Sequence, residues 1–279
     1  MKKLLALILV SIFAAPLFAQ NFSGKKIARE IYISAPQKFL NTDENLEYSM
    51  EWIGIPVGKI FLRTGLQADI NGRDYYLLAV EAFPNAFFAS FYNVKYSLRT
   101  FMDKVYFLPV RSEKYRRIKD KVNKEAIDFN HIRGEIKYKA EGEAPTVIIS
   151  PNRVAMEGKM PVTYKILADS QDLLSSFYFL RLSSLTPGQK LKINVYYGLR
   201  NWVMDVVIGK PYLKSIRRKG NLEVFDAVIT SDLNKFVLGD GRLTVCLTAD
   251  SRRIPIEFKL GIGLGAFRGV IKQAPVVNE

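Results

Sequence analysis

Few side chains in this sequence have the chemistry that catalysis or metal binding requires. The chain of 279 residues contains one histidine, His131, and one cysteine, Cys246. A zinc site usually combines several Cys and His ligands, and a Ser-His-Asp hydrolase needs a histidine beside its serine. No G-x-S-x-G or G-x-x-x-x-G-K-[ST] motif occurs. His131 falls in a predicted turn, so we expect no catalytic set, no metal and no cofactor.

Glu47 and Glu51 are the carboxylate pair that merits a test. They are four residues apart in a predicted strand, so both point to the same face. Glycosidases need two carboxyl groups about 5–10 Å apart, and such positions can supply them. We favour a solvated strand face with cross-strand ion pairs, and a glycan-directed hydrolase remains the less favoured alternative.

Cys246 lies in an alternating run, with Leu243, Val245 and Leu247 on one face and Thr244, Cys246 and Thr248 on the other. This pattern indicates a small strand residue rather than a nucleophile. An exported chain with one cysteine has no internal disulfide, so its stability depends on core packing.

The dominant signal elsewhere is alternation of apolar and polar residues, bounded by Gly, Asn and Asp, which is typical of strands. Asn71-Gly72 and Asp240-Gly241 suit tight hairpins, and short connections imply antiparallel pairing. The predicted strands are 46–53, 57–66, 73–82, 93–102, 105–118, 124–130, 133–139, 145–149, 190–197, 201–209, 222–229, 242–249, 253–260 and 265–272.

One segment has helical periodicity. Leu173, Phe177 and Leu180 recur at helical spacing, after Asp169 or Ser170 as a predicted cap. The sequence Thr186-Pro187-Gly188 ends the pattern. We predict a helix over about 170–184, packed on the concave side of the sheet.

Aromatic residues gather in a second apolar segment, 81–94, around a turn at Pro84-Asn85. The plainer interpretation is core packing beside the main helix. The functional alternative is an aromatic lip that contacts acyl chains or a membrane surface. The residues of the ligand-binding hypothesis are Phe87, Phe88, Phe91, Tyr92, Phe177 and Tyr178.

Basic residues are in excess and form two clusters. The formal net charge is +14, which makes the surface attractive to anions. Segments 113–124 and 214–220 hold the clusters, each near the end of a predicted strand. Such charges can protect edge strands from wrong pairing. If they converge, they form an anion-binding rim, and its proposed members are Arg116, Arg117, Arg217, Arg218 and Lys219.

The first residues have the pattern of a secretory signal peptide. Lys2 and Lys3 precede an apolar run from Leu4 to Ala15, and Ala19 precedes the expected cleavage point. The alternative is an uncleaved anchor, although the run is shorter than a membrane span. We therefore expect export to the periplasm, with outer-membrane association or secretion as alternatives. The expected organisation is a signal peptide (1–19), an extension (20–40), a single β-rich domain (41–273) and a tail (274–279).

Four stretches together resemble the exported bacterial family known as domain of unknown function 3108. They are "LEYSMEWIGIPVGKIFLR" at 46–63, "DLLSSFYFLRLSSLTPGQKLKI" at 172–193, "VFDAVITSDL" at 224–233 and "LTVCLTADSRRIPIEFKLGIGLGAFRGVI" at 243–271. The resemblance covers about residues 40–272. It implies a cell-envelope protein of uncharacterised role, and it brings no activity, cofactor or catalytic residue.

Two of these stretches hold residues that we treat as a structural signature. In the stretch 46–63, Trp52 is expected to pack inward at a hairpin corner. Residues Gly54 to Pro56 form the predicted turn, and Gly58 lies at the start of the next strand. In the stretch 243–271, Asp250 and Ser251 form a predicted turn, and Pro255 occupies an edge or bulge position. For Asp250, Arg252 and Arg253 we expect a buried ion-pair latch, with a binding role as the alternative.

The sequence thus predicts a mainly β protein with a large curved antiparallel sheet or incomplete barrel and one packed helix. The leading functional hypothesis is a non-catalytic, periplasmic protein that binds or carries a lipid-like or anionic envelope molecule. Contact with a membrane surface is a related expectation, and no nucleic-acid partner is expected. The alternative is a structural or assembly partner of envelope proteins. An outer-membrane barrel is disfavoured because charges occur within short, variable strands.

Overall fold

The computed structural model describes residues 40, 43–67, 74–91, 93–142, 162–216, 220–231, 242–262 and 265–272. The proposed signal peptide, the predicted strand 145–149 and both Asn71-Gly72 and Asp240-Gly241 lie outside these ranges. Within them, no helix is long and apolar enough to cross a membrane.

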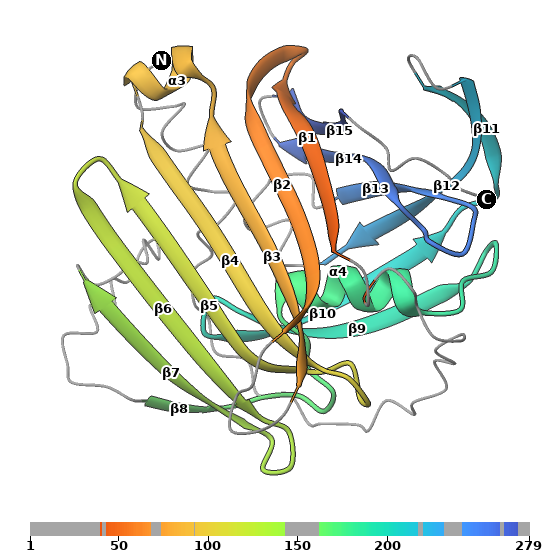
Figure 1. Cartoon of the computed structure of the whole chain (residues 1–279). Helices are drawn as coiled ribbons and strands as arrows, with labels where there is room; N and C mark the ends of the chain where they lie inside the picture. The colour runs from red at the N-terminus through yellow and green to blue at the C-terminus, as the bar shows by residue number, and fades with distance from the viewer. Residues whose placement is uncertain are drawn as a thin grey trace.

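The described residues form one antiparallel sheet of 15 strands that curls strongly (Figure 1). The strand order is β8-β7-β6-β5-β4-β3-β2-β1-β15-β14-β13-β12-β10-β9, and β11 pairs with β12 beside this path. Before the main helix come β1 (Glu44–Trp52), β2 (Ile55–Gln67), β3 (Tyr75–Pro84), β4 (Val94–Asp103), β5 (Pro109–Ile118), β6 (Lys121–Asn130), β7 (Glu135–Gly142) and β8 (Val162–Lys165). After it come β9 (Lys190–Tyr197), β10 (Arg200–Ile208), β11 (Tyr212–Ile216), β12 (Gly220–Thr230), β13 (Arg242–Thr248), β14 (Pro255–Ile262) and β15 (Gly265–Ile271).

The two ends of the sheet are joined by side-chain hydrogen bonds and by one isolated parallel bridge, Gln171 opposite Val195, rather than by a continuous strand ladder. Asn201 donates from Nδ2 to the Lys165 carbonyl at 3.0 Å, and its Oδ1 accepts from the Leu167 amide at 3.0 Å. Asn194 donates to the Ala168 carbonyl at 2.8 Å. The sheet is therefore barrel-like but not closed, which confirms the predicted fold class.

The predicted helix is present as α4 (Leu173–Leu182), within the curl of the sheet (Figure 1). Eight of its ten residues are buried, as expected for a helix that is apolar on most sides. Leu174, Tyr178 and Leu182 pack in one cluster with strands β1–β4, and Phe179 and Leu180 pack in another with β9, β10, β12 and β13. The helix therefore lies on the concave side of the described sheet and packs against strands of both its halves.

The cap of α4 differs from the prediction. Asp172 is the N-cap, accepting from the Ser175 amide at 2.7 Å, while the Ser175 hydroxyl accepts from the Asp172 amide at 2.9 Å. Ser170 instead donates to the Leu167 carbonyl, and Asp169 has a φ of 53° within the preceding turn. Asp172 also accepts a bond of 2.6 Å from Thr100 of β4, so the cap attaches the helix to the sheet.

A buried arginine attaches the other end of α4. Arg181 has no exposed surface, and its guanidinium forms a bidentate pair with Glu44 of β1, at 2.8 and 2.9 Å. Its remaining donors reach the carbonyls of Arg253 at 3.0 Å and Arg252 at 3.2 Å. The C-terminal end of the helix is thereby fixed to the first strand and to the β13–β14 connection.

Three further expectations need correction. The first corner is a two-residue turn, Ile53-Gly54, and Pro56 already belongs to β2, opposite Glu51 at an irregularity of the ladder. Residues 104–108 connect β4 and β5 rather than forming strand, and Asp103 at the end of β4 accepts from the amides of Val105 and Tyr106. The 81–94 segment contains a short helix, α3 (Ala86–Phe91), whose first turn is capped by Asn85.

Breaking the Arg181–Glu44 pair should strongly destabilise the fold. We expect Glu44→Gln to lower the free energy of unfolding by about 3–5 kcal/mol, because a buried charge loses its partner. Urea denaturation followed by circular dichroism would measure the change. Asp205→Asn is the matched control, since the Lys192–Asp205 pair is more than half exposed and such pairs contribute about 0–1 kcal/mol. Equal effects of the two substitutions would contradict the prediction.

The buried cap should make stability depend on pH. Burial raises the pKa of Asp172 above its ordinary 3.8, so the folded state keeps its proton at a pH where the unfolded chain has released it. The stabilisation is therefore complete below pH 3.8 and declines as pH rises through the elevated folded pKa. Relative to Asp172→Asn, the wild type should lose free energy of unfolding as pH rises from 3.8. A difference that stays constant across urea titrations at pH 4 to 7 would refute this.

Candidate functional site

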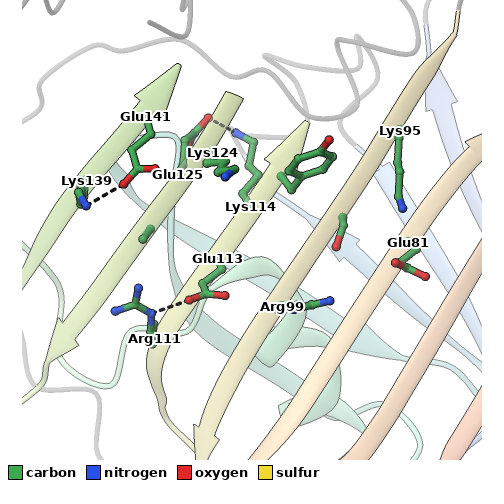
Figure 2. A pocket seen from close by; sticks show the side chains of 13 residues that line it. Glu81, Lys95, Arg99, Arg111, Glu113, Lys114, Lys124, Glu125, Lys139 and Glu141 are labelled. Carbon is green, nitrogen blue, oxygen red and sulfur yellow. Dashed lines mark hydrogen bonds and ion pairs between the residues drawn. The ribbon is translucent and has the colours of Figure 1, made fainter. Parts of the chain in front are cut away.

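A pocket of about 490 Å³ lies on the outer face of strands β3 to β7, opposite the face that holds α4 (Figure 2). Its lining is rich in charged groups of both signs. The residues are Glu81, Lys95, Ser97, Arg99, Arg111, Glu113, Lys114, Tyr115, Lys124, Glu125, Ala126, Lys139 and Glu141. In this lining six side chains are basic and four are acidic, so the pocket has a formal surplus of positive charge.

The register of the strands creates the pocket. In β4 the inward residues Tyr96, Leu98 and Thr100 are buried, so the alternate residues Ser97 and Arg99 face outward. Cross-strand pairing continues each outward position as a row. One row is Glu81, Ser97, Tyr115, Lys124 and Glu141, and the next is Ala79, Arg99, Glu113, Ala126 and Lys139. The short side chains of Ser97 and Ala126 leave the space between their long neighbours open.

Every carboxylate that lines the pocket has a basic partner. On the outer face the pairs are Arg63–Glu81 (3.0 Å), Arg111–Glu113 (2.8 Å) and Lys139–Glu141 (2.7 Å); the fourth pair, Lys114–Glu125 (2.9 Å), continues the row of the inward Leu98 and lies on the inner side. Figure 2 shows the last three of these pairs as dashed contacts. The hydrogen bond from Lys139 lowers the pKa of Glu141, which opposes a role as a proton donor near neutral pH.

Three basic side chains of the pocket are not paired with a carboxylate of the described residues. Among the described residues, Lys95, Arg99 and Lys124 form no ion pair within 4.0 Å. Lys95 lies over the Phe83 ring, with Nζ 5.4 Å from its centroid. The hydroxyl groups of Ser97 and Tyr115 likewise have no hydrogen-bond partner within the described ranges. These groups can donate to an anionic or hydroxyl-bearing ligand.

The structure separates the residues of the aromatic ligand hypothesis. Phe87, Phe88 and Phe91 belong to α3 at the upper end of the sheet in Figure 1, whereas Phe177 and Tyr178 belong to α4 below it. Phe88 and Phe177 pack against the core, and Tyr178 has no exposed surface. Tyr92 lies outside the described residues. The described aromatic residues of the hypothesis therefore belong to two different helices, and their binding role stays a prediction.

The basic clusters are also far apart where they are described. Arg116 and Arg117 lie near the end of β5, and Lys214 of the second cluster lies on β11 at the opposite side of the molecule (Figure 1). Lys214 pairs with Glu257 at 2.6 Å. Arg217, Arg218 and Lys219 fall outside the described ranges, so their part of the rim stays a prediction.

The predicted latch in the "DSRRIP" stretch needs correction. Asp250 and Arg252 do pair, at 2.6 Å, but their side chains are 40% and 33% exposed. Arg253 makes no contact with the Asp250 carboxylate through its guanidinium; it donates to the carbonyls of Arg181 and Ser183 at the end of α4. Pro255 begins β14 and accepts the Tyr48 hydroxyl through its carbonyl at 2.6 Å. The buried ion pair of this region is Arg181–Glu44.

The other residues considered for catalysis are held in ion pairs or buried in a strand. Glu47 pairs with Lys59 at 3.0 Å and Lys272 at 3.3 Å, and the Lys59 hydrogen bond lowers its pKa. Glu51 faces Arg268 at 3.8 Å. Burial in β13 raises the pKa of Cys246 to about 11, which disfavours the thiolate.

His131 and the acidic residues form no metal site. The His131 ring stacks on Phe129, with centroids 5.7 Å apart, and Nε2 lies 2.8 Å from the Pro109 carbonyl. Across the part of the chain that the structure describes, no group of three or more His, Cys, Asp or Glu side chains could hold a metal ion.

Sequence patterns alone did not single out Arg99, Lys95 and the floor residues Ser97 and Ala126. The available signal was the outward position of each residue in five successive predicted strands. This signal can be used only when the pairing register is known. Arg99 and Ala126 are far apart in the sequence, but they lie in one cross-strand row, on β4 and β6.

The fold and pocket together define a barrel-like, mainly β protein with a charged site on its outer face. The chain belongs to the family described as "Protein of unknown function (DUF3108)", whose model matches residues 47–272. No curated protein matches the chain.

Among solved structures, the chain is similar to a barrel-like protein of another uncharacterised family. It is the "Beta-barrel-like Protein of Domain of Unknown Function DUF1849 from Brucella abortus", with a TM-score of 0.50 and 12% sequence identity, covering 83% of this chain and 96% of that chain. At this identity the similarity concerns the fold alone.

Proposed function

We propose that the protein is an exported, non-catalytic protein of the cell envelope that binds an anionic molecule in the pocket on the outer face of β3–β7. This proposal rests on three basic side chains around one pocket, Lys95, Arg99 and Lys124, which form no ion pair with the described residues. Cations beside an open space attract anions more strongly than cations already paired with carboxylates.

The chemistry of the lining favours a phosphate or carboxylate carried on a hydroxyl-rich molecule. Arg99 offers a planar set of donors that fits either anion, while Lys124 offers a compact charge. Ser97 and Tyr115 add hydroxyl groups next to these cations. Anionic glycans and phosphorylated head groups of the envelope share this combination of charge and hydroxyl groups.

The arrangement gives less support to a lipid carried inside the sheet. The concave side of the described sheet holds α4 and two apolar clusters, so acyl chains would have to displace the helix. The paired carboxylates of the pocket and the lowered pKa of Glu141 support binding rather than glycan hydrolysis, because a general acid needs a raised pKa.

The pocket can be tested with two anionic probes and a neutral one by isothermal titration calorimetry. The probes are glycerol 3-phosphate, a galacturonate tetrasaccharide and the uncharged cellotetraose. We expect binding of at least one anionic probe, and a loss of affinity of tenfold or more in Arg99→Gln/Lys124→Gln, since each charge-assisted bond contributes about 1.5–3 kcal/mol. Added salt should weaken the binding.

Two further variants make this experiment specific. Ala126→Leu fills the pocket without a change of charge and should also lower the affinity. Lys59→Gln/Lys192→Gln removes the same charge from exposed ion pairs outside the pocket and should leave the affinity within twofold. The proposal fails if neither anionic probe binds better than cellotetraose, or if both double variants weaken binding equally.

A structural role in envelope assembly is the second candidate, and the attachment of α4 at both ends favours it. A protein whose curved sheet is braced by its own helix can serve as a rigid partner for other proteins. Cross-linking in intact cells would then trap a discrete complex with an envelope protein, and the pocket variants above would not alter it.

A further inference from the structure

Four large apolar side chains are exposed at one end of the sheet. They are Ile53 (62%), Ile55 (56%), Phe87 (65%) and Phe91 (54%), and together we call them the apolar tip. The isoleucines belong to the β1–β2 hairpin and the phenylalanines to α3, and both elements lie at the upper end of the sheet in Figure 1. Single exposed apolar residues are ordinary, whereas a group of this kind marks an interaction surface.

The two elements of the tip are held together by Asn85. Its side chain donates to the Pro56 carbonyl at 2.7 Å, and its amide donates to the Val57 carbonyl at 2.9 Å. In α3, Phe88 packs against the core while Phe87 contacts the Phe91 ring at 5.3 Å on the exposed side. The tip is therefore a fixed feature of the fold.

Ile53 occupies a position that suits its residue type poorly. Its φ is 51°, and Gly54 follows with 77°, as in the two-residue hairpin turns that favour Asn-Gly. A β-branched residue is rare in this left-handed region, and strain of this kind gathers at functional positions. Its side chain lies directly over Gly265, where an added Cβ would come within 2.8 Å of Ile53 Cγ1. The turn thus exposes an apolar side chain at a position where Asn would fit the backbone conformation without strain and would offer a polar side chain.

Basic residues lie next to α3. The Lys119 amide donates to the carbonyl of Asn93, just beyond the helix, at 3.0 Å, which places the β5–β6 turn beside the tip. Arg117, Lys119 and Lys121 around this turn are exposed, and Asp120 is the one acidic residue between them. Apolar side chains flanked by cations are typical of surfaces that bind anionic bilayers.

We infer that the apolar tip, with the basic β5–β6 turn, docks the protein onto an anionic lipid bilayer. The tip side chains enter the boundary between head groups and acyl chains, and the cations lie at the phosphates. This surface is separate from the outer pocket and does not depend on a ligand there.

Vesicle co-sedimentation tests this inference. The purified protein should sediment with vesicles of phosphatidylethanolamine and phosphatidylglycerol in a 3:1 ratio, and much less with phosphatidylcholine vesicles. Phe87→Ser/Phe91→Ser and Ile53→Asn/Ile55→Thr should each lower the apparent affinity tenfold or more. Asn suits the left-handed turn, so the second variant keeps the hairpin. Circular dichroism and urea midpoints would verify that each variant folds.

Val105→Ser/Ile132→Ser is the matched control, because these side chains are 71% and 100% exposed in turns at the other end of the sheet. It should bind vesicles as the wild type does, and so should Arg99→Gln/Lys124→Gln. The inference is overturned if the wild type does not sediment, if the control loses as much affinity as the tip variants, or if the tip variants bind vesicles unchanged. Loss of a cross-linked protein with unchanged vesicle binding would identify the tip as a protein interface instead.

Discussion

One buried guanidinium joins parts of this sheet that are far apart in the sequence. Arg181 divides its donors between the Glu44 carboxylate of the first strand and the carbonyls of Arg252 and Arg253. Arg253 donates in return to carbonyls at the end of α4. Segments separated by more than two hundred residues thus meet on one helix end. A buried charge without these acceptors would be very costly, so α4, the first strand and the β13–β14 connection must stay together around Arg181 in the folded state.

The opposite end of α4 is fixed by a second buried acidic group. Asp172 caps the helix and accepts from Thr100 in the middle of β4. The helix is attached to the sheet at both ends and eight of its ten residues are buried, so it lies where a barrel of this kind can hold a ligand. The groups that we consider for binding a partner lie on the outer surface. They are the outward side chains of β3–β7 and the exposed side chains at the strand ends.

Local patterns in the sequence were sufficient for most of the described strands, the main helix and the fold class, because alternation and helical spacing act over a few residues. They failed where several residues could play one role: Asp169, Ser170 and Asp172 are all good caps, and only the tertiary bond to Thr100 selects Asp172. They also missed β8 and β11, which are short. One weak signal in the sequence indicated the Arg181–Glu44 pair: Arg181 is the charged residue of a mostly apolar helix. The pocket could not be predicted without the pairing register of five strands.

The pocket and the apolar tip are linked by the course of β4. This strand begins just after α3, and Lys95, its second residue, already lines the pocket. The tip lies at the end of the strands, whereas the pocket opens on their outer face, so the two surfaces are neighbours but can act independently. Because Ile53 retains a strained and exposed conformation that Asn would relieve, stability alone does not account for the tip. The same antiparallel register that orders the outward charges also places this apolar end beside them, and it gives the molecule one face suited to an anionic surface.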